Sequence, residues 1–125
     1  MIVIDKTSEL PVYAQLVRQI ELGILRGLYL PGDQLPSVRE LSVTLGINPN
    51  TISKSYAELI RKGVIVSAHG SGSYVSPDAP VLLAREAEAR LPELKELIGE
   101  LLRSGVDGEA IRRTAEEALR EKGDG

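Results

Sequence analysis

The spacing of apolar positions in the middle of the chain changes from a helical to an extended period. Residues 38–45 and 49–61 carry apolar side chains three or four positions apart, which predicts two amphipathic helices joined by a tight turn. Residues 64–68 and 73–76 are β-prone runs on either side of the glycine-containing loop 69–72, which predicts a hairpin. The expected inward side chains are Val38, Leu41 and Leu45 in the first helix and Ile52, Tyr56, Leu59 and Ile60 in the second.

Both helix starts carry capping signals. Ser37 with Glu40 three positions later forms a capping box, and Asn48 can cap the second helix, with Pro49 at its first position. Gly63 marks the end of that helix. Two helices followed by a hairpin is the order of a winged helix-turn-helix, a unit that places its second helix against nucleic acid.

Helical patterns also lie on either side of this unit. A first helix is expected from about Pro11 to Arg26, and residues 76–80 (SPDAP) predict a linker. The segment that follows is rich in alanine, glutamate and leucine, and Pro92 predicts a kink or break within it. Asp107 is expected to cap a final helix.

The apolar stripe of this tail has too few partners within the tail to be buried. An exposed apolar stripe usually marks an interface, and two-fold pairing with a second copy is the simplest way to cover it. The predicted dimerisation residues are Leu83, Ala87, Leu91, Leu94, Ile98, Leu101 and Leu102. We therefore expect a mainly α fold with a small β-wing (α+β). It would comprise a winged helix-turn-helix DNA-binding domain at residues 1–78 and a short C-terminal helical dimerisation tail at residues 79–125.

The composition argues against several classes of function. The chain has no cysteine, which excludes disulfides, thiol catalysis and thiolate metal sites. Its one histidine cannot form a metal site alone, so no metal site is expected. No apolar run approaches the length of a membrane span and no signal peptide is evident, so we expect a cytoplasmic protein without a membrane partner. No catalytic motif stands out, so we expect neither an enzyme nor a cofactor.

Charge is distributed unevenly along the chain. Residues 1–78 carry seven Lys or Arg and seven Asp or Glu, so residues 79–125 carry the whole net charge of −3. Within residues 35–62 there are four basic and two acidic side chains, which allows a local positive face. DNA-binding domains are usually more basic than this. We therefore expect binding through local fields, with a salt slope of roughly −3 to −6.

Three segments together resemble the GntR family of bacterial transcription regulators. They are residues 35–41 (LPSVREL), residues 45–53 (LGINPNTIS) and the wing residues 70–75 (GSGSYV). The run Asn48 to Thr51, with Tyr56 following, is similar to the YtrA-type subfamily in particular. Members of that subfamily have only a short helical tail used for dimerisation, and the length of this chain agrees. The resemblance implies a regulator whose target is an operon that contains its own gene and transporter genes.

The candidate DNA contacts on the second helix are Asn50, Thr51, Ser53 and Lys54, in the turns that touch base edges in helix-turn-helix proteins. Asparagine can bond an adenine edge with two hydrogen bonds, and lysine can reach guanine acceptors or phosphate. The alternative is a solvated helix start with good capping residues. Asn48 is expected to cap the helix more than to read bases, although a phosphate contact stays open.

Further candidates flank that helix. In the family, the arginine that matches Arg39 contacts DNA; the alternative here is an exposed ion pair with Glu40 or Asp33. Ser37 and the amides beside it would bind phosphate at the positive end of the helix. Related wings often carry Arg or Lys where this chain has Ala68 and His69, so we expect His69 and the Gly70 amide to make the wing contact. His69 as a plain loop residue is the alternative.

These features together predict a sequence-specific DNA-binding transcriptional regulator, a repressor that binds double-stranded DNA with an inverted-repeat operator as a homodimer. The alternative is a winged-helix module that binds another protein instead of DNA. No effector domain is visible, and the sequence does not identify an effector ligand.

Overall fold

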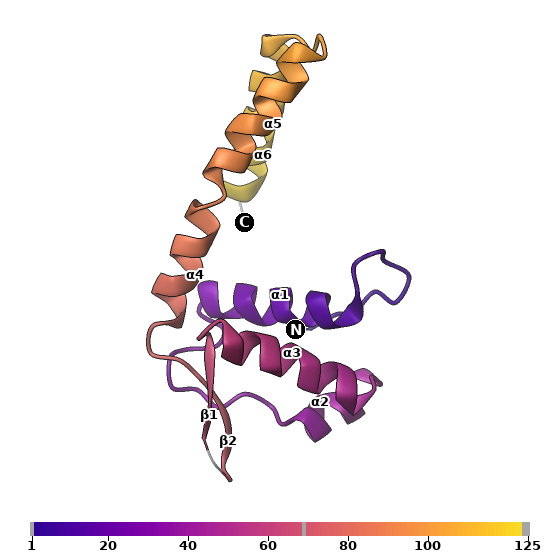
Figure 1. Ribbon diagram of the computed structural model, residues 1–125, viewed down its shortest axis with the longest axis vertical. Helices are drawn as coiled ribbons and strands as arrows, with labels where there is room; N and C mark the ends of the chain where they lie inside the picture. Colours follow the sequence, from indigo (N-terminus) through magenta and orange to yellow (C-terminus); the bar gives the residue numbers. More distant parts are fainter. Residues whose placement is uncertain (1, 69, 124–125) are drawn as a thin grey trace. The chain divides into compact units, whose positions relative to one another are not determined.

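The computed structural model describes residues 2–68 and 70–123 and divides the chain into two compact units, Met1–Glu86 and Ala87–Gly125 (Figure 1). The helices and strands, in chain order, are α1 (Val12–Leu25), α2 (Val38–Leu45), α3 (Pro49–Arg61), β1 (Ile65–Ala68), β2 (Gly72–Val75), α4 (Ala79–Glu88), α5 (Leu91–Arg103) and α6 (Gly108–Gly123).

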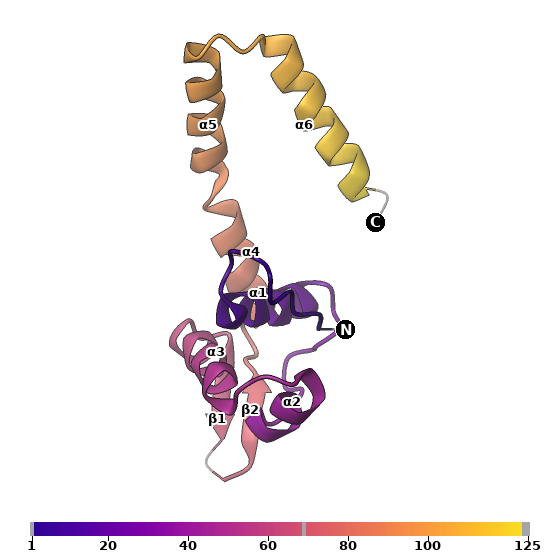
Figure 2. The ribbon, with the colours of Figure 1, turned by 90° about the vertical axis from the view of Figure 1, so that its right-hand side faces the viewer.

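The first unit is the predicted winged helix-turn-helix with one additional helix in front. Helix α1 lies along α3, α2 packs against α3, and the β1–β2 hairpin extends from the end of α3 (Figures 1 and 2). One apolar cluster joins these elements. Its buried members are Leu16, Val17, Ile20, Ile24, Leu35, Leu41, Ile47, Ile52, Tyr56, Leu59, Val64, Ile65, Val75, Ala79 and Leu83.

The predicted helix starts are confirmed in atomic detail. The Ser37 hydroxyl accepts the Glu40 amide at 3.0 Å, while the Glu40 carboxylate accepts the Ser37 amide, which completes the capping box. The Asn48 side chain accepts the Asn50 amide at 2.8 Å. Between the two helices, Gly46 adopts a left-handed conformation with φ of 65°, which closes α2 and turns the chain into α3.

The wing is a two-stranded antiparallel hairpin in which Ile65 pairs with Val75 and Ala68 pairs with Gly72. β1 begins one residue later than the predicted run 64–68, and β2 is shifted by one residue towards the N-terminus from the predicted run 73–76. A short bridge adds the segment before α2 to the free edge of β2: Gln34 pairs with Tyr74, and the Leu35 amide donates to the Ser73 carbonyl at 2.9 Å. The base of the wing is therefore tied directly to the helix-turn-helix.

Three expectations are corrected. Residues 76–80 are not a free linker, because Ser76 and Ala79 are buried and α4 begins at once. Leu83 is 4% exposed and belongs to the core of the first unit, so it does not continue the apolar stripe of the tail. Ile60 is 41% exposed, because it lies at the edge of the inner face of α3.

The second unit contains α5 and α6, joined by the loop at residues 104–107 (Figure 2). The break predicted at Pro92 is confirmed: α4 ends at Glu88, and Pro92 lies in the first turn of α5. The Asp107 carboxylate accepts the Glu109 amide at 3.1 Å and caps α6 as expected. No helix in the described part of the chain is long and apolar enough to cross a membrane.

Candidate nucleic-acid interface

Helix α3 has one buried face and one polar, exposed face. Ile52 and Leu59 are completely buried, with Ser55 and Tyr56 beside them. The opposite face presents Asn50, Ser53, Lys54, Ala57 and Arg61 to solvent. Thr51 is half-buried at the border between the faces. The structure thus brings together on one surface three of the four base-reading candidates of this helix.

Two buried hydroxyl groups fix the position of α3. The Ser55 hydroxyl donates to the Tyr13 carbonyl of α1 at 3.0 Å. The Tyr56 hydroxyl donates to the Pro36 carbonyl, just before α2, and burial raises the pKa of Tyr56 above its ordinary value. Because each hydroxyl reaches a different neighbouring segment, α3 is held against both α1 and the start of α2.

Three predicted DNA contacts at or near the starts of α2 and α3 differ in whether their side chains already have a partner within the protein. Arg39 is exposed in the first turn of α2, and among the described residues it forms no ion pair, so the expected alternative with Glu40 or Asp33 is not seen. Ser37 and Asn48 are exposed but use their side-chain oxygens to cap α2 and α3. Capping uses only these oxygens as acceptors, so among the described residues the Ser37 hydroxyl hydrogen and the Asn48 side-chain NH2 group remain as donors for a ligand.

Lys54 has a contact that the sequence did not predict. Its ammonium lies 3.9 Å from the centroid of the Tyr13 ring, a cation–π contact between α3 and the start of α1. Tyr13 is half-buried, so its ring provides a platform that limits the directions in which Lys54 points. No local pattern signals this pair, because 41 residues separate its members.

The cations at the other end of α3 are neutralised within the protein. Arg61 pairs with Glu58, and Lys62 lies between Glu21 of α1 and Glu86 of α4, at 2.5 and 2.9 Å. Burial lowers the pKa of Lys62, but its hydrogen bonds to the two carboxylates outweigh that effect and raise it overall. Positive charge available to an anion is therefore concentrated towards the beginning of α3.

The wing tip lies partly outside the described residues, since His69 is not among them. Gly70 is exposed with φ of 77°. The Gln34 amide group donates to the Ser71 carbonyl at 2.8 Å and braces the loop from the segment before α2. A Cβ added at Gly72 would lie 2.7 Å from the Gln34 amide nitrogen, so this side chain fits closely under the loop. Sequence reasoning missed Gln34, because its contact spans 37 residues.

Sequence reasoning also missed Lys6. Its ammonium lies 3.5 Å from the Gly46 carbonyl, in the turn between α2 and α3. The residue comes before every helix and belongs to no motif. Only the folding of residues 3–10 back over α1 brings its charge to this turn.

Comparison with known proteins gives consistent results. The model of the family described as "Bacterial regulatory proteins, gntR family" matches residues 12–75. The HTH-type transcriptional repressor YtrA of Bacillus subtilis (strain 168) is 41% identical over 118 residues, which cover 94% of this chain and 91% of that protein.

Solved structures agree with the fold. A GntR family transcriptional regulator from Listeria monocytogenes superposes with a TM-score of 0.73 at 34% identity, covering 91% of this chain and 98% of that chain. AraR(DBD) in complex with operator ORE1 superposes with a TM-score of 0.53 at 30% identity, covering 61% of this chain and 93% of that chain. A relative of this winged helix has thus been crystallised on its operator.

Proposed function

Since this chain belongs to the gntR family of bacterial regulatory proteins, we propose that it is a repressor that binds an inverted-repeat operator as a homodimer. The family consists of DNA-binding transcriptional regulators and not of enzymes. The single observation that carries the proposal is the polar, exposed face of α3, supported from behind by a buried core. As a bacterial DNA-binding regulator, it would act in the cytoplasm, where the DNA lies.

Helix α3 is the proposed recognition helix. Its 13 residues span about 20 Å at 1.5 Å per residue, which is enough to cross a major groove. Asn50 would read a base edge, with Ser53 and Thr51 next to it, while Arg39 approaches from the first turn of α2. The operator complex of AraR supports this use of the unit, because the superposed region is a winged helix of the same kind.

Lys54 and the capping residues have supporting roles in this proposal. The Tyr13 ring holds the Lys54 ammonium beside the N-terminal half of α3, where it would meet a phosphate or a guanine edge. Ser37 and Asn48 keep the amide-rich starts of α2 and α3 ordered, and such helix starts attract phosphate. The wing, with Gly70 and His69, would lie over the adjacent backbone or minor groove.

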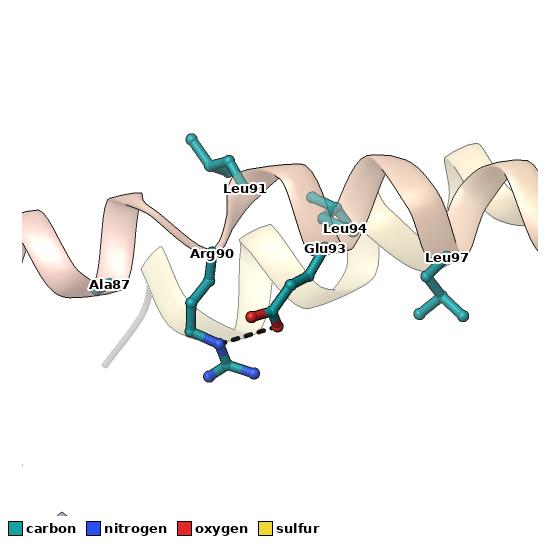
Figure 3. A pocket seen from close by; sticks show the side chains of 6 residues that line it. All are labelled: Ala87, Arg90, Leu91, Glu93, Leu94 and Leu97. Carbon is teal, nitrogen blue, oxygen red and sulfur yellow. Dashed lines mark hydrogen bonds and ion pairs between the residues drawn. The ribbon is translucent and has the colours of Figure 1, made fainter.

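The second unit is the proposed dimerisation element. No side chain of α5 is buried, and Leu91, Leu94 and Leu97 are each more than half exposed. Figure 3 shows these three leucines along α5, with the Arg90–Glu93 ion pair among them. A helix pair of this size with an open apolar surface needs a partner. A second copy supplies the same surface, and two-fold pairing closes the assembly.

A hollow between α5 and α6 also supports dimerisation through the second unit. An apolar hollow of about 310 Å³ separates them, lined by Leu94, Leu97, Ile98, Leu101, Val106, Ala110, Ile111, Thr114, Ala115 and Ala118. Side chains from the partner would fill it. Of the predicted dimerisation residues, Leu94, Ile98 and Leu101 line this hollow, Ala87, Leu91 and Leu102 are also in the second unit, and Leu83 is in the core of the first.

Repression is proposed from the relative that covers nearly the whole chain, since YtrA of Bacillus subtilis is named a transcriptional repressor. A dimer bound over a promoter would block RNA polymerase by occupancy alone.

The proposal is tested by selecting bound sequences from a random duplex library, in parallel for the wild type and Asn50→Ala. We expect an inverted repeat whose preference Asn50→Ala weakens at one position in each half-site. Arg61→Ala, at the other end of α3, is the control and should select the wild-type motif. Failure of the wild type to enrich any motif at low salt would favour the protein-interaction alternative.

A further inference from the structure

The segment before α1, residues 3–10, is fastened to that helix by two glutamine side chains, and we name it the N-terminal strap. Gln19 bonds both the amide and the carbonyl of Val3, with the amide bond at 2.7 Å. Gln15 accepts the Asp5 amide at 2.9 Å and donates to the carbonyls of Asp5 and Leu10, each at 2.8 Å. Gln15 is buried, and both its side-chain oxygen and its side-chain NH2 group take part in these hydrogen bonds. The strap therefore has a defined path.

Within the strap, a tight local turn presents Lys6. The Asp5 carboxylate accepts both the amide and the hydroxyl of Thr7, at 2.9 and 2.6 Å, which places Lys6 at the corner of the turn. The same Thr7 donors lower the pKa of Asp5. The carboxylate nearest to Lys6 along the chain is thus directed at Thr7 and bonded there, and the Lys6 side chain extends to the Gly46 carbonyl.

We propose that Lys6 is a DNA-phosphate contact, carried by the N-terminal strap to the turn of the helix-turn-helix. The proposal rests on the proposed function, because it requires the beginning of α3 to face DNA. Gly46 lies two residues before the Asn48 cap, so a cation there lies next to the end of α3 that would enter the groove. The backbone phosphates beside the groove are the anions available at that position.

The geometry leaves Lys6 able to bind such a group. Its ammonium has three N–H donors, and the contact with the Gly46 carbonyl is long at 3.5 Å, so within the described part of the chain at least two donors are free. A lysine binds phosphate as a point charge and does not read sequence. Lys6 would therefore raise affinity for every duplex to the same extent.

The low charge of the first unit makes this contact important. Residues 1–78 are neutral, and Lys62 and Arg61 are neutralised by carboxylates of the protein. Few cations remain near the start of α3, among them Arg39 and Lys54. Adding Lys6 gives one more phosphate contact per half-site, and two per dimer.

The test measures the salt dependence of operator affinity for the full-length wild type, Lys6→Gln, Lys6→Arg and Arg26→Gln. Arg26, exposed at the opposite end of α1, controls for the loss of one positive charge. Each phosphate contact contributes about 0.9 to the slope of log affinity against log salt, so Lys6→Gln should flatten the slope of a dimer by about 1.8. Between 50 and 200 mM salt, the wild-type advantage over Lys6→Gln should then shrink about 12-fold.

Lys6→Arg should keep the wild-type slope, and Arg26→Gln should leave it unchanged. Equal flattening by Lys6→Gln and Arg26→Gln would mean a general charge effect and would overturn the contact. An unchanged slope for Lys6→Gln would also overturn it, while leaving DNA binding by the wild type intact. A wild type that binds no duplex would instead refute the proposed function together with the contact.

A second measurement locates the phosphate. Operators are made with a single neutral methylphosphonate at successive backbone positions. We expect one position in each half-site at which neutralisation weakens the wild type but not Lys6→Gln. If every position affects the two proteins equally, no phosphate contact belongs to Lys6.

Discussion

Replacing Tyr56 with phenylalanine isolates the hydrogen bond that joins α3 to the start of α2. The ring stays in the core, where Tyr56 is 5% exposed, so packing is kept and only the hydroxyl is lost. The Pro36 carbonyl loses its donor. A neutral hydrogen bond contributes about 0.5–1.5 kcal/mol, and an acceptor left unpaired costs about 1–3 kcal/mol. Because Pro36 is only half-buried and water can reach it, we expect a loss of about 1–1.5 kcal/mol.

The same substitution has a signature at alkaline pH. Burial raises the pKa of Tyr56, so the folded state keeps the phenol protonated where the unfolded state, with a pKa near 10, ionises. The stability from Tyr56 is therefore complete below pH 10 and is lost as the pH rises towards the folded value. For a folded pKa well above 11, this loss is about 1.4 kcal/mol between pH 9 and pH 11. Tyr56→Phe cannot show it.

The assay is urea unfolding of the full-length protein. At pH 7, tyrosine fluorescence reports on the first unit alone, because all four tyrosines precede residue 87 and three remain in the variant. Circular dichroism at pH 9 and pH 11 then compares the pH dependence of the two proteins. The wild type should lose about 1.4 kcal/mol more than the variant over this interval. Equal losses would refute a buried, protonated Tyr56, and an unchanged midpoint at pH 7 would refute the value assigned to its hydrogen bond.

Three other substitutions test the remaining parts. Leu97→Asp places a charge on the apolar surface of α5 and should give monomers by light scattering; persistent dimers would place the interface elsewhere. Lys62→Met leaves two carboxylates without their shared cation and should cost about 1 kcal/mol in urea unfolding, whereas no change would mean that solvent already screens the cluster. Gly72→Ala introduces a side chain at φ of 110° and against Gln34. It should reduce operator affinity in a filter-binding assay, and wild-type affinity would show that this loop geometry is dispensable.

Local chemistry explains why the helix-turn-helix could be predicted from sequence. The capping residues of α2 and α3 lie within three residues of each other in sequence: Ser37 with Glu40, and Asn48 with Pro49. These caps therefore do not depend on contacts with distant parts of the chain. The apolar spacing of Ile52, Tyr56 and Leu59 requires one buried face of α3, which the structure has.

Contacts between distant residues could not be predicted in this way. The Lys54–Tyr13 pair joins α1 to α3, and the Lys62–Glu21 pair joins α1 to the C-terminal cap of α3; each spans 41 residues and neither has a local signature. The spacing of Leu83 continues the apolar stripe of the tail, but that spacing does not reveal which part of the protein covers the side chain, and the structure places it in the core of the first unit. The position of Lys6 has no local signature either, since it depends on Gln15 and Gln19 holding the N-terminal strap.

Helix α4 has a consequence for recombination between proteins. The chain passes from the first unit to the second once, after Glu86, and Ala79 and Leu83 of α4 are part of the core before that point. A gene fusion joined after residue 86 would keep a complete folded module and could attach it to another carboxyl-terminal partner. A junction after residue 78 would remove two core side chains and leave a hole. The viable breakpoint for domain shuffling therefore lies inside a helix and not at the proline-rich turn where the sequence suggests it.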